Sequence, residues 1–579
     1  MVGARIDFAA PDGVGPRLRH AFADPCAQLV AHTAAEVRAV LDAVQAQAEA
    51  GRWCVGFLRY EAAAAFDPAL AAHAADGPLA WFGVYDEALP WPEDGTEETD
   101  AAWRIDWDSA LPRAAFDGAL AEVARAIAAG EVYQVNYTAP LAGHWSGDTQ
   151  ALFAALRRAQ PGGYAAFLDT GGEQVLSVSP ELFFDWQGGR LLARPMKGTA
   201  PRGATPAEDA AARAALQASP KERAENVMVV DMLRNDLSRV ADPFSVQVPR
   251  LFCTEALPTV WQMTSDVQAR TRAGCTLADV FAALFPCGSV TGAPKVQAMR
   301  MVRALEPQPR GVYCGAVGVV RPGGHATFNV PIRTVVLAGG QARCGIGSGL
   351  VADAQPDAEW REWRHKRAFL DRASAPFQLL ETFALHDGQA RSLPEHLERM
   401  AAAATHFGIR WQAQAVQQCV ERLCAAHPAG RWRARLLLDR HGRPQAEAFD
   451  ASEPPPAVAR LQLASVPFEA ADSEFVRFKT TRRAHYDAFA PAAGVFDTLL
   501  WNTRGEITEG TRCNVALQLD GRWLTPPLHC GLLGGVGRAH WLREGRVAEG
   551  VVRLDDLPRV QALAVFNSLR GWIGASLAR

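Results

Sequence analysis

A short linker, Ala373-Ser374-Ala375-Pro376, separates a helix that runs out after His365-Lys366-Arg367 from a new strand that opens at Leu379. The chain has 579 residues, which is more than one hydrophobic core normally serves, so we expect at least two domains. The expected divisions are an N-terminal part at 1–110, a catalytic domain at 111–372 and a second domain at 373–579, with a small subdomain at about 376–470 and a large one at about 471–579.

Composition excludes several classes of protein. Hydrophobic residues make up 49% of the chain and charged residues 21%, as in ordinary globular proteins. A net charge of −4 gives no reason to expect nucleic acid or an anionic membrane as a partner. No apolar run approaches a membrane span, and the N-terminus lacks an apolar signal core. Eleven cysteines without a Cys-x-x-Cys pair favour reduced thiols in a cytoplasm, and disfavour a zinc site or a disulfide framework.

The stretch Arg194-Pro195-Met196-Lys197-Gly198-Thr199 follows an apolar run and predicts a strand that ends in a tight loop, with Lys197 at its mouth. Most lysines are solvated surface charges. A nucleophilic lysine must be neutral, and at an ordinary pKa of about 10.4 only about one in 2,500 is neutral at pH 7, so burial or a nearby cation would have to lower its pKa. Another strand-like segment, Ser177-Val178-Ser179-Pro180-Glu181, ends in a carboxylate.

Two predicted helices each carry a pair of carboxylates. Residues 219–240 begin with Ser219 as N-cap and proline at the first helical position, and they place Glu222 and Glu225 three apart on one face. Glu359 and Glu362 repeat that spacing in a second helix. Such pairs are most often exposed to solvent, but two helices that each offer a pair could also hold Mg²⁺, which prefers oxygen ligands.

Two further segments place polar groups in apolar surroundings. Residues 131–138 alternate like a strand, with Gln134 and Asn136 on one face that either meets solvent or lines a pocket. The Gly-rich segment 285–295 leads into a helix at 296–305 and could place backbone N–H groups around an anion, although it is not a Walker motif.

Two helices and a strand pair are also predicted. Helical periodicity covers residues 34–50 and 116–129, and residues 310–318 and 328–334 read as paired strands. Arg333 lies in the second of these apolar strands, and a buried arginine needs an anionic partner from the protein or from a ligand.

Together these residues resemble the chorismate-using enzymes, which include the anthranilate, aminodeoxychorismate, isochorismate and salicylate synthases. The resemblance covers residues 110–370 and rests on six ordered motifs: Ser179-Pro180-Glu181, 221–236, 288–295, 310–318, Ile332-Arg333-Thr334 and 345–366. It implies a mixed α/β fold of the anthranilate-synthase type, with a β-sandwich core flanked by helices. Anthranilate synthases have alanine at the position of Lys197 and aminodeoxychorismate synthases have lysine. The isochorismate branch has a lysine base where this chain has Gln134, so that branch is disfavoured.

The resemblance also implies a role for each group. Lys197 would attack chorismate at C2, Glu181 would protonate the leaving 4-hydroxyl, and ammonia would then add at C4. Mg²⁺ would bind the ring carboxylate and would be held by Glu222, Glu225, Glu359 and Glu362. Substrate would be bound by Gln134, Asn136, Thr291, Tyr313, Arg333 and Gly347. Gln262 departs from the family, because anthranilate synthases have histidine there, so no role carries over to it.

The implied amination needs ammonia, and no motif of the sequence accounts for its source. Both recognisable domains are assigned otherwise, and no Gly-x-Cys-x-Gly nucleophile elbow of a glutaminase is present. The resemblance therefore implies a separate glutamine amidotransferase subunit as a partner.

The remainder of the chain contains motifs that are individually weak: Leu379-Leu380-Glu381-Thr382, the helical segment 396–400, Lys479 in an apparent Val/Phe/Thr strand, and 505–514. A lysine in such a strand more often protects an exposed edge. Together, residues 376–579 resemble the class IV, or branched-chain type, pyridoxal-phosphate fold, specifically aminodeoxychorismate lyase. This implies that Lys479 binds pyridoxal phosphate covalently and shuttles a proton, and that Glu509 pairs with the pyridine nitrogen. The phosphate would be held by Arg399 and by two loops that contain Val536 and Gly537, and Asn567 and Ser568.

The product implied for the first domain, 4-amino-4-deoxychorismate, is the substrate implied for the second. We therefore interpret the chain as a bifunctional enzyme of folate synthesis that makes 4-aminobenzoate and releases pyruvate. Two alternatives stay open: an anthranilate synthase joined to an amino-acid transaminase, and a synthase with a non-catalytic class IV module. A homodimer through the class IV domain, direct transfer of the intermediate, and an amino-acid pocket within 1–110 are also left open.

Overall fold

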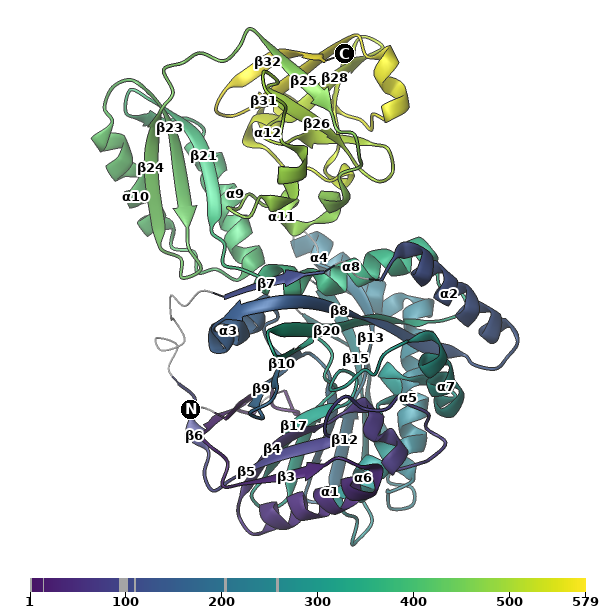
Figure 1. The fold of residues 1–579 in the computed structure, drawn as a ribbon. Coiled ribbons are helices and arrows are strands. Elements are labelled where there is room, and N and C mark those ends of the chain that lie inside the picture. Colours follow the sequence, from purple (N-terminus) through teal and green to yellow (C-terminus); the bar gives the residue numbers. More distant parts are fainter. Residues whose placement is uncertain are drawn as a thin grey trace. The chain divides into compact units, whose positions relative to one another are not determined.

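The structure is a computed structural model that describes residues 3–13, 15–92, 103–108, 111–202, 206–256 and 260–578. The chain forms two compact units, unit 1 (Met1–Ala375) and unit 2 (Pro376–Arg579), shown in Figure 1. The division falls within the Ala373-Ser374-Ala375-Pro376 linker.

Unit 1 is built on two ten-stranded sheets whose inner faces share one hydrophobic cluster. Sheet 1 has the order β16-β8-β20-β19-β10-β9-β1-β2-β6, with β7 against β8. Its strands are β1 (Ala4–Phe8), β2 (Leu18–Phe22), β6 (Leu89–Pro90), β7 (Trp103–Trp107), β8 (Gln134–Gly147), β9 (Tyr164–Asp169), β10 (Gln174–Ser179), β16 (Gly292–Ala293), β19 (Thr334–Ala338) and β20 (Gln341–Leu350).

Sheet 2 has the order β13-β15-β12-β11-β18-β17-β4-β5-β3, with β14 against β15. Its strands are β3 (Ala27–Ala31), β4 (Trp53–Leu58), β5 (Ala80–Tyr85), β11 (Leu182–Gln187), β12 (Arg190–Arg194), β13 (Met196–Pro201), β14 (Gln247–Ala256), β15 (Val260–Arg270), β17 (Ala316–Arg321) and β18 (His325–Asn329). Strands from residues 1–110 enter both sheets, since β1 pairs with β9 and β4 pairs with β17.

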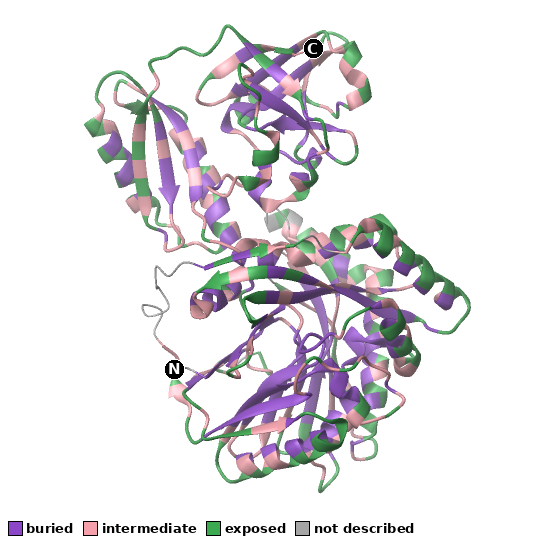
Figure 2. Ribbon diagram, viewed as in Figure 1, coloured by how far each residue is buried: buried purple, intermediate pink, exposed green. Residues whose placement is uncertain are grey.

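Alternation along the strands gives each sheet an inner and an outer apolar face. On β9, Tyr164, Ala166 and Leu168 belong to the cluster between the sheets, whereas Ala165 and Phe167 pack in the cluster beneath the helices. The central strands of both sheets are accordingly mostly buried in Figure 2, whereas β14 and β3 are partly exposed and the helices expose one side. The predicted β-sandwich core flanked by helices is confirmed.

Helices cover both outer faces, and Figure 1 shows α1 and α6 on one side of the sandwich and α2, α3 and α8 on the other. The helices of unit 1 are α1 (Ala34–Glu49), α2 (Arg113–Ala128), α3 (Thr149–Ala159), α4 (Pro206–Ala218), α5 (Pro220–Ser238), α6 (Leu277–Leu284), α7 (Lys295–Leu305) and α8 (Pro356–Ala373). Ser219 caps α5 as predicted and accepts a hydrogen bond from the Glu222 N–H at 3.4 Å. In the described ranges, no helix combines the length and apolar character that crossing a bilayer requires.

The predicted strand pair at 310–318 and 328–334 is only partly correct. β17 and β18 pair, but β17 begins at Ala316 and β18 ends at Asn329. The chain then crosses to sheet 1, where β19 begins at Thr334, and Arg333 lies in this crossing at φ +51°. Arg333 is therefore not a strand residue, because the apolar residues on either side of it serve two different sheets.

The loop predicted at Lys197 is also wrong. Lys197 lies inside β13, which pairs with β15 at Met196↔Thr264 and at Thr199↔Gln262, with a register shift between the two pairs. A strand ending and a β-bulge look alike in sequence when the partner strand lies far along the chain.

Unit 2 contains a four-stranded and an eight-stranded sheet. Sheet 3 has the order β22-β21-β23-β24 and packs against α9 (Leu393–Phe407) and α10 (Ala413–Ala426). Sheet 4 has the order β27-β26-β25-β32-β31-β28-β29-β30, and α12 (Val536–Arg543) packs on β31. The strands are β21 (Leu379–His386), β22 (Gln389–Ala390), β23 (Arg431–Leu438), β24 (Pro444–Asp450), β25 (Val458–Leu463), β26 (Asp497–Trp501), β27 (Ile507–Gly510), β28 (Asn514–Leu519), β29 (Arg522–Thr525), β30 (Ala548–Glu549), β31 (Ala562–Asn567) and β32 (Gly571–Leu577).

β25 already belongs to sheet 4, before the subdomain boundary that we expected near residue 470. The strand predicted around Lys479 is replaced by the short helix α11 (Glu474–Arg477), which Ser473 caps. Phe475 and Val476 are buried because this helix packs them inward, and Phe475 joins the apolar cluster beneath sheet 3. β-branched and aromatic residues therefore misled the prediction, since tertiary packing overrides local propensity in so short a segment.

We predict that Phe281→Ala destabilises unit 1 by about 3–5 kcal/mol, because it leaves a cavity in a fully buried aromatic cluster. Phe281 has no exposed surface, and its ring centroid lies 5.0 Å from that of Phe328 and 5.2 Å from that of Phe184. Urea unfolding of the full chain measures the change. Phe244→Ala is the matched control, since Phe244 is fully exposed; equal losses in the two variants would contradict the predicted packing.

Candidate active sites

Lys197 lies where the edge of sheet 2 meets β8 and β20 of sheet 1. A methyl group at Gly349 on β20 would lie 2.5 Å from the Lys197 amine nitrogen and 2.7 Å from the Gln134 amide nitrogen, so these three residues meet. The Lys197 side chain is mostly buried, at 14% exposure. Gln134 is fully buried, and neither polar atom of its side chain has a hydrogen-bond partner among the described residues. A buried amide without a partner is costly, so this corner is suited to a polar ligand.

Glu181 is the acid of this corner and lies where the chain passes from β10 of sheet 1 to β11 of sheet 2. It is 3% exposed, and the Ser289 hydroxyl donates to its Oε1 at 2.7 Å. Burial raises the pKa of Glu181 to about 7, although the Ser289 hydrogen bond and the charge of Lys197 act in the opposite direction. Near neutral pH this carboxyl is therefore protonated in a substantial fraction of molecules.

Ser289 was not predicted as a functional residue, although it lies in the Gly-rich motif at 288–295. In the same loop, the Thr291 hydroxyl donates to the Cys287 carbonyl at 3.1 Å, and the Thr291 carbonyl accepts from the Asn136 N–H at 2.9 Å. The loop is thereby tied to β8. Thr291 and Asn136, both expected to bind substrate, lie next to each other, and the hydrogen bonds that they make hold the loop in place.

The four predicted metal ligands come from α5 and α8. Glu225 lies 3.9 Å from the Lys197 amine. Burial, and then the charge of Glu225, raises the pKa of Glu222; burial likewise raises the pKa of Glu359 against a 2.6 Å hydrogen bond from Ser348. The charge of Glu362 raises the pKa of both Glu222 and Glu359, so the two helices face one another across a shared acidic region.

The donor atoms of the four glutamates suit a hard cation, but their side chains are not close enough together to enclose one. All four donors are carboxylate oxygens, which Mg²⁺ prefers. Over the described ranges, no group of three or more His, Cys, Asp or Glu side chains is drawn together tightly enough to hold a metal ion. Lys366, one turn after Glu362, forms an ion pair with the Glu362 carboxylate at 2.7 Å. Its amine also donates to the Gly347 carbonyl at 2.9 Å. Sequence reasoning missed Lys366, although its i,i+4 spacing from Glu362 was a usable signal.

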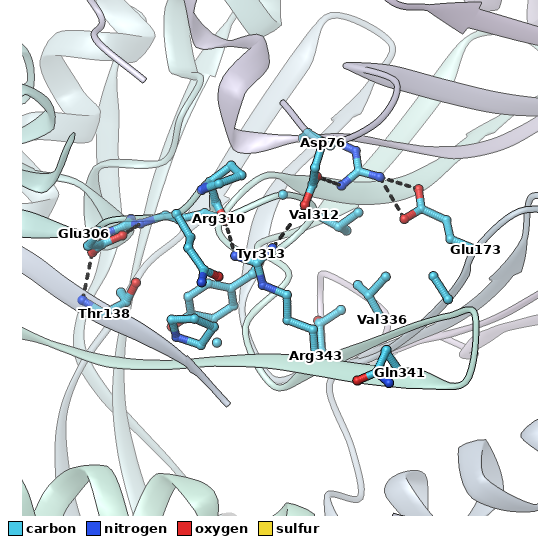
Figure 3. Close-up of a pocket in the computed structure, with 18 of the residues that line it drawn as sticks. Asp76, Thr138, Glu173, Glu306, Arg310, Val312, Tyr313, Val336, Gln341 and Arg343 are labelled. Atoms are coloured by element: carbon cyan, nitrogen blue, oxygen red, sulfur yellow. Dashed lines mark hydrogen bonds and ion pairs between the residues drawn. The ribbon is translucent and has the colours of Figure 1, made fainter. Parts of the chain in front are cut away.

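Tyr313 packs its ring on Gly345, where a methyl group would lie 2.2 Å from the ring. It also lines a cavity of about 240 Å³, shown in Figure 3, together with Thr138, Arg310 and Arg343. Thr138 lies on β8 opposite Gly347 of β20, but Gln134, Lys197 and Gly349 are not among the residues that line this cavity.

Arg333 has no carboxylate partner among the residues that the structure describes. Burial lowers the pKa of its guanidinium to about 10. Its guanidinium donates to the side-chain amide oxygen of Gln160. A partly buried arginine in this state can accept an anionic group as partner.

In unit 2, Lys479 follows α11, and its backbone carbonyl accepts from the Leu380 N–H at 3.0 Å. Burial outweighs the opposing charge of Glu381 and, together with the charges of Arg399 and Arg483, lowers the pKa of its amine to about 8. The amine is therefore neutral in an appreciable fraction of molecules at slightly alkaline pH, as a nucleophilic lysine requires.

Glu509 is a buried acid at 4% exposure. The Tyr486 hydroxyl donates to its Oε1 at 2.8 Å and the Leu533 N–H to its Oε2 at 3.1 Å, while burial raises its pKa to about 7. Asn514 donates both to Glu509, at 3.4 Å, and to the Leu533 carbonyl, at 2.9 Å. This network fixes the orientation of the Glu509 carboxyl.

Arg399 on α9 connects this region to sheet 3. Its Nε and one terminal nitrogen donate to Glu381 at 2.8 and 2.7 Å, and the other terminal nitrogen donates to the Gly534 carbonyl at 3.0 Å. His396 lies 2.6 Å from the same carboxylate. Burial raises the pKa of Glu381, but Arg399 and His396 outweigh it and bring the pKa to about 2. Glu381 and His396 lay in motifs we noted, yet sequence alone assigned them no role.

The two predicted phosphate loops meet at Gly537. A methyl group there would lie 2.8 Å from the Ser568 backbone nitrogen and 2.7 Å from the Asn567 carbonyl carbon. Val536 and Gly537 begin α12, so their N–H groups lie at a helix N-terminus, while the Asn567 carboxamide oxygen accepts from the Arg570 N–H at 2.8 Å. Because residue 537 has no side chain, the N-terminus of α12 can approach the second loop closely. The N–H groups of a helix N-terminus suit the binding of an anion. These residues fit pyridoxal phosphate.

Comparison with known proteins agrees with this geometry. Residues 5–372 match the family model of the chorismate binding enzymes, and residues 378–577 match that of class IV amino-transferases. Aminodeoxychorismate synthase component 1 of Klebsiella aerogenes is 39% identical over 284 residues, which cover 49% of this chain and 61% of that protein. Anthranilate synthase component 1 of Streptomyces coelicolor is 40% identical over 266 residues, which cover 46% of this chain and 52% of that protein. The chain thus spans little more than half of the length of these two curated relatives.

A solved structure supports the fold of unit 1. Anthranilate synthase component I of Streptococcus pneumoniae superposes with a TM-score of 0.51 and 23% identity, covering 64% of this chain and 90% of that chain. At this identity the likeness concerns the fold alone.

We predict that Gly349→Ala destabilises unit 1 by about 1–3 kcal/mol, because the new methyl group collides with Lys197 and Gln134. Gly118→Ala is the matched control, since it lies in α2 with open space around it and should stabilise by about 0.5–1 kcal/mol. Urea unfolding measures both. The same sign of change in the two variants would show that Gly349 is not where the three side chains meet.

Proposed function

The chain belongs to the chorismate binding enzyme family, and we propose that it converts chorismate to 4-aminobenzoate in two steps, one in each unit. Unit 1 acts as an aminodeoxychorismate synthase and unit 2 as an aminodeoxychorismate lyase. The observation that carries the proposal is the meeting of a lysine amine, Lys197, with the buried amide Gln134 beside the protonatable acid Glu181.

In the first step, Lys197 attacks C2 of the ring while Glu181 gives its proton to the departing 4-hydroxyl, which leaves as water. Ammonia then adds at C4, the lysine amine leaves from C2, and 4-amino-4-deoxychorismate results. Arg333 and Tyr313 bind the carboxylates, which gives the partly buried guanidinium an anionic partner. A carboxyl with a pKa of about 7 is suited to this role, because a general acid works best when its pKa lies near the working pH.

Mg²⁺ belongs to this step. Glu225 and Glu362 would hold it, with Glu222 and Glu359 acting directly or through water, and it would neutralise the ring carboxylate of chorismate. The raised pKa values of Glu222 and Glu359 support this, since they come first from burial and then from neighbouring carboxylates, and a dication would offset both effects.

The ammonia would come from a glutamine amidotransferase subunit. The chain contains no Gly-x-Cys-x-Gly nucleophile elbow, and the Klebsiella aerogenes relative carries the name component 1. All eleven cysteines are free, which suits the reducing cytoplasm in which we place the reaction.

In the second step, pyridoxal phosphate bound at Lys479 supplies an electron sink. Glu509 would hold the proton of the pyridine nitrogen, Arg399 and the start of α12 would bind the phosphate, and Lys479 would move the proton that allows pyruvate to leave. The buried position of Glu509 and the lowered pKa of Lys479 support catalysis rather than a degenerate module.

An anthranilate synthase joined to a transaminase is the second candidate, because the Streptomyces coelicolor relative is as similar as the aminodeoxychorismate synthase. Lys197 argues against it, since the resemblance places alanine at that position in anthranilate synthases. The identity of the product separates the two candidates.

We predict that the full chain, given chorismate, an ammonium salt, Mg²⁺ and pyridoxal phosphate, forms 4-aminobenzoate and pyruvate. Lys197→Ala should lower the rate at least about 100-fold because no amine adds to the ring, whereas Lys479→Ala should accumulate 4-amino-4-deoxychorismate. Chromatography with mass spectrometry identifies the products. 2-Aminobenzoate would establish the second candidate, and accumulation of the intermediate by wild type would establish a non-catalytic unit 2.

We predict that Ser289→Ala moves the alkaline limb of kcat/KM for the first step upward by about one pH unit. Glu181 acts when protonated, so activity falls as pH rises through its pKa of about 7. The Ser289 hydroxyl stabilises the charged form, and its removal raises that pKa. Ser238→Ala at the exposed end of α5 is the control and should leave the limb in place; an unmoved limb in Ser289→Ala would assign the proton to another group.

A further inference from the structure

We propose that Asn226 and Gln262 are positioning residues that hold the backbone of Lys197 and Gly198 and so aim the Lys197 amine. The inference rests on the proposed function of unit 1, since it concerns the lysine that we expect to attack the ring. It also assigns a role to Gln262, the position at which the sequence departs from anthranilate synthases.

We call Asn226 and Gln262 the clamp. The backbone of Lys197 and Gly198 needs it because β13 contains a β-bulge there. The ladder to β15 is regular at Met196↔Thr264 and resumes at Thr199↔Gln262, with a register shift in between. Lys197 and Gly198 lie within the shift, and Gly198 takes a left-handed conformation at φ +97°. Their carbonyl groups are therefore not part of the regular ladder, and in a protein interior such groups require other partners.

Two side-chain amides supply those partners. The Asn226 amide nitrogen donates to the Lys197 carbonyl at 3.3 Å, and the Gln262 amide nitrogen donates to the Gly198 carbonyl at 2.8 Å. The other end of Gln262 accepts from the Thr199 hydroxyl at 3.2 Å. Residues 197–199 are thus held by Gln262 on the neighbouring strand β15 and by Asn226 on helix α5.

The amides are themselves held in one orientation. The Ser265 hydroxyl donates to the Asn226 oxygen at 2.6 Å, so only the Asn226 nitrogen remains to face Lys197. Asn226 has no exposed surface, Ser265 is 1% exposed and Gln262 is 8% exposed. Both ends of the Gln262 carboxamide are hydrogen-bonded to the bulge, the nitrogen to Gly198 and the oxygen to Thr199. Gln262 therefore has a structural role and does not carry a proton.

The clamp also connects the amine to the acidic region. Asn226 directly follows Glu225 on α5, and the Glu225 carboxylate lies 3.9 Å from the Lys197 amine. Glu222, one turn earlier, would lie 3.1 Å from a methyl group at Gly198. A single helix therefore fixes the backbone of Lys197 and also supplies the carboxylates beside its amine.

Gln262→Met tests the proposal, because methionine keeps the volume but donates no hydrogen bond. We expect kcat of the first step, measured in full-length protein as chorismate consumed with an ammonium salt, to fall about 10- to 100-fold at a KM for chorismate within about twofold of wild type. If the Lys197 amine is wrongly oriented, its attack on the ring becomes slower, whereas the binding of chorismate in the ground state is unchanged. Gln268→Met, on the same strand at a partly exposed site, is the matched control and should leave kcat unchanged.

Two further measurements separate aiming from folding. Acylation of Lys197 by an amine-selective reagent, followed by peptide mass spectrometry, should be at least about threefold faster in Gln262→Met, because a released turn lets the amine reach solvent. Thr199→Val keeps the shape, removes only the hydroxyl, and should lower kcat several-fold if Gln262→Met proves unstable.

The outcomes distinguish this inference from the proposed function. Wild type that forms no aminated product would overturn the proposed function, and the acylation rates would still decide the clamp. Wild type that forms product, with kcat and acylation unchanged in both Gln262→Met and Thr199→Val, would overturn the clamp alone. A rise in KM without a fall in kcat would place Gln262 against substrate and also overturn it.

Discussion

The arrangement of unit 1 depends on two chain crossings between its sheets, which lie side by side and bond to each other. The Ser179 hydroxyl donates to the Val330 carbonyl at 2.5 Å, the Val330 N–H to the Glu181 carbonyl at 3.1 Å, and the Val178 N–H to the Arg333 carbonyl at 3.1 Å. A segment that leaves one sheet for another cannot be paired in either, so its backbone groups must find partners in the gap. The backbone groups of these two segments are hydrogen-bonded to one another, and the segments carry the acid Glu181 and the cation Arg333.

Burial acts on three carboxyl groups in the two units with two different results. Glu181 and Glu509 accept hydrogen bonds from hydroxyl groups, and burial raises their pKa to about 7. Glu381 is equally buried, but it contacts Arg399 directly and its pKa falls to about 2. Contact with a cation therefore decides whether a buried acid holds a proton near neutral pH, and the two acids that do hold one are those to which the proposed chemistry assigns proton transfer or pairing.

Irregular backbone supplies the reactive groups of unit 1. The bulge in β13 points Lys197 toward Gln134, and the absence of a side chain at Gly349 leaves room for both. A regular ladder would have paired the Lys197 carbonyl and turned its side chain with the alternation of the strand. The irregularity is stable because buried amides replace the missing ladder bonds, so the same residues serve packing and chemistry.

Sequence by itself determined the features that depend on neighbours a few residues apart. These are the Ser219 cap and carboxylate pair of α5, the matching pair on α8, the linker between the units, and the ordered motifs that indicate the family. Tertiary structure alone decided that Lys197 lies in a bulged strand, that Lys479 follows a helix, that Arg333 lies in a crossing, and which side chains hold Glu181 and Gly198. The reason is physical: caps and helical spacing act within one turn, whereas a sheet partner, a buried charge and a backbone clamp come from segments far apart in the chain, whose meeting no local pattern encodes.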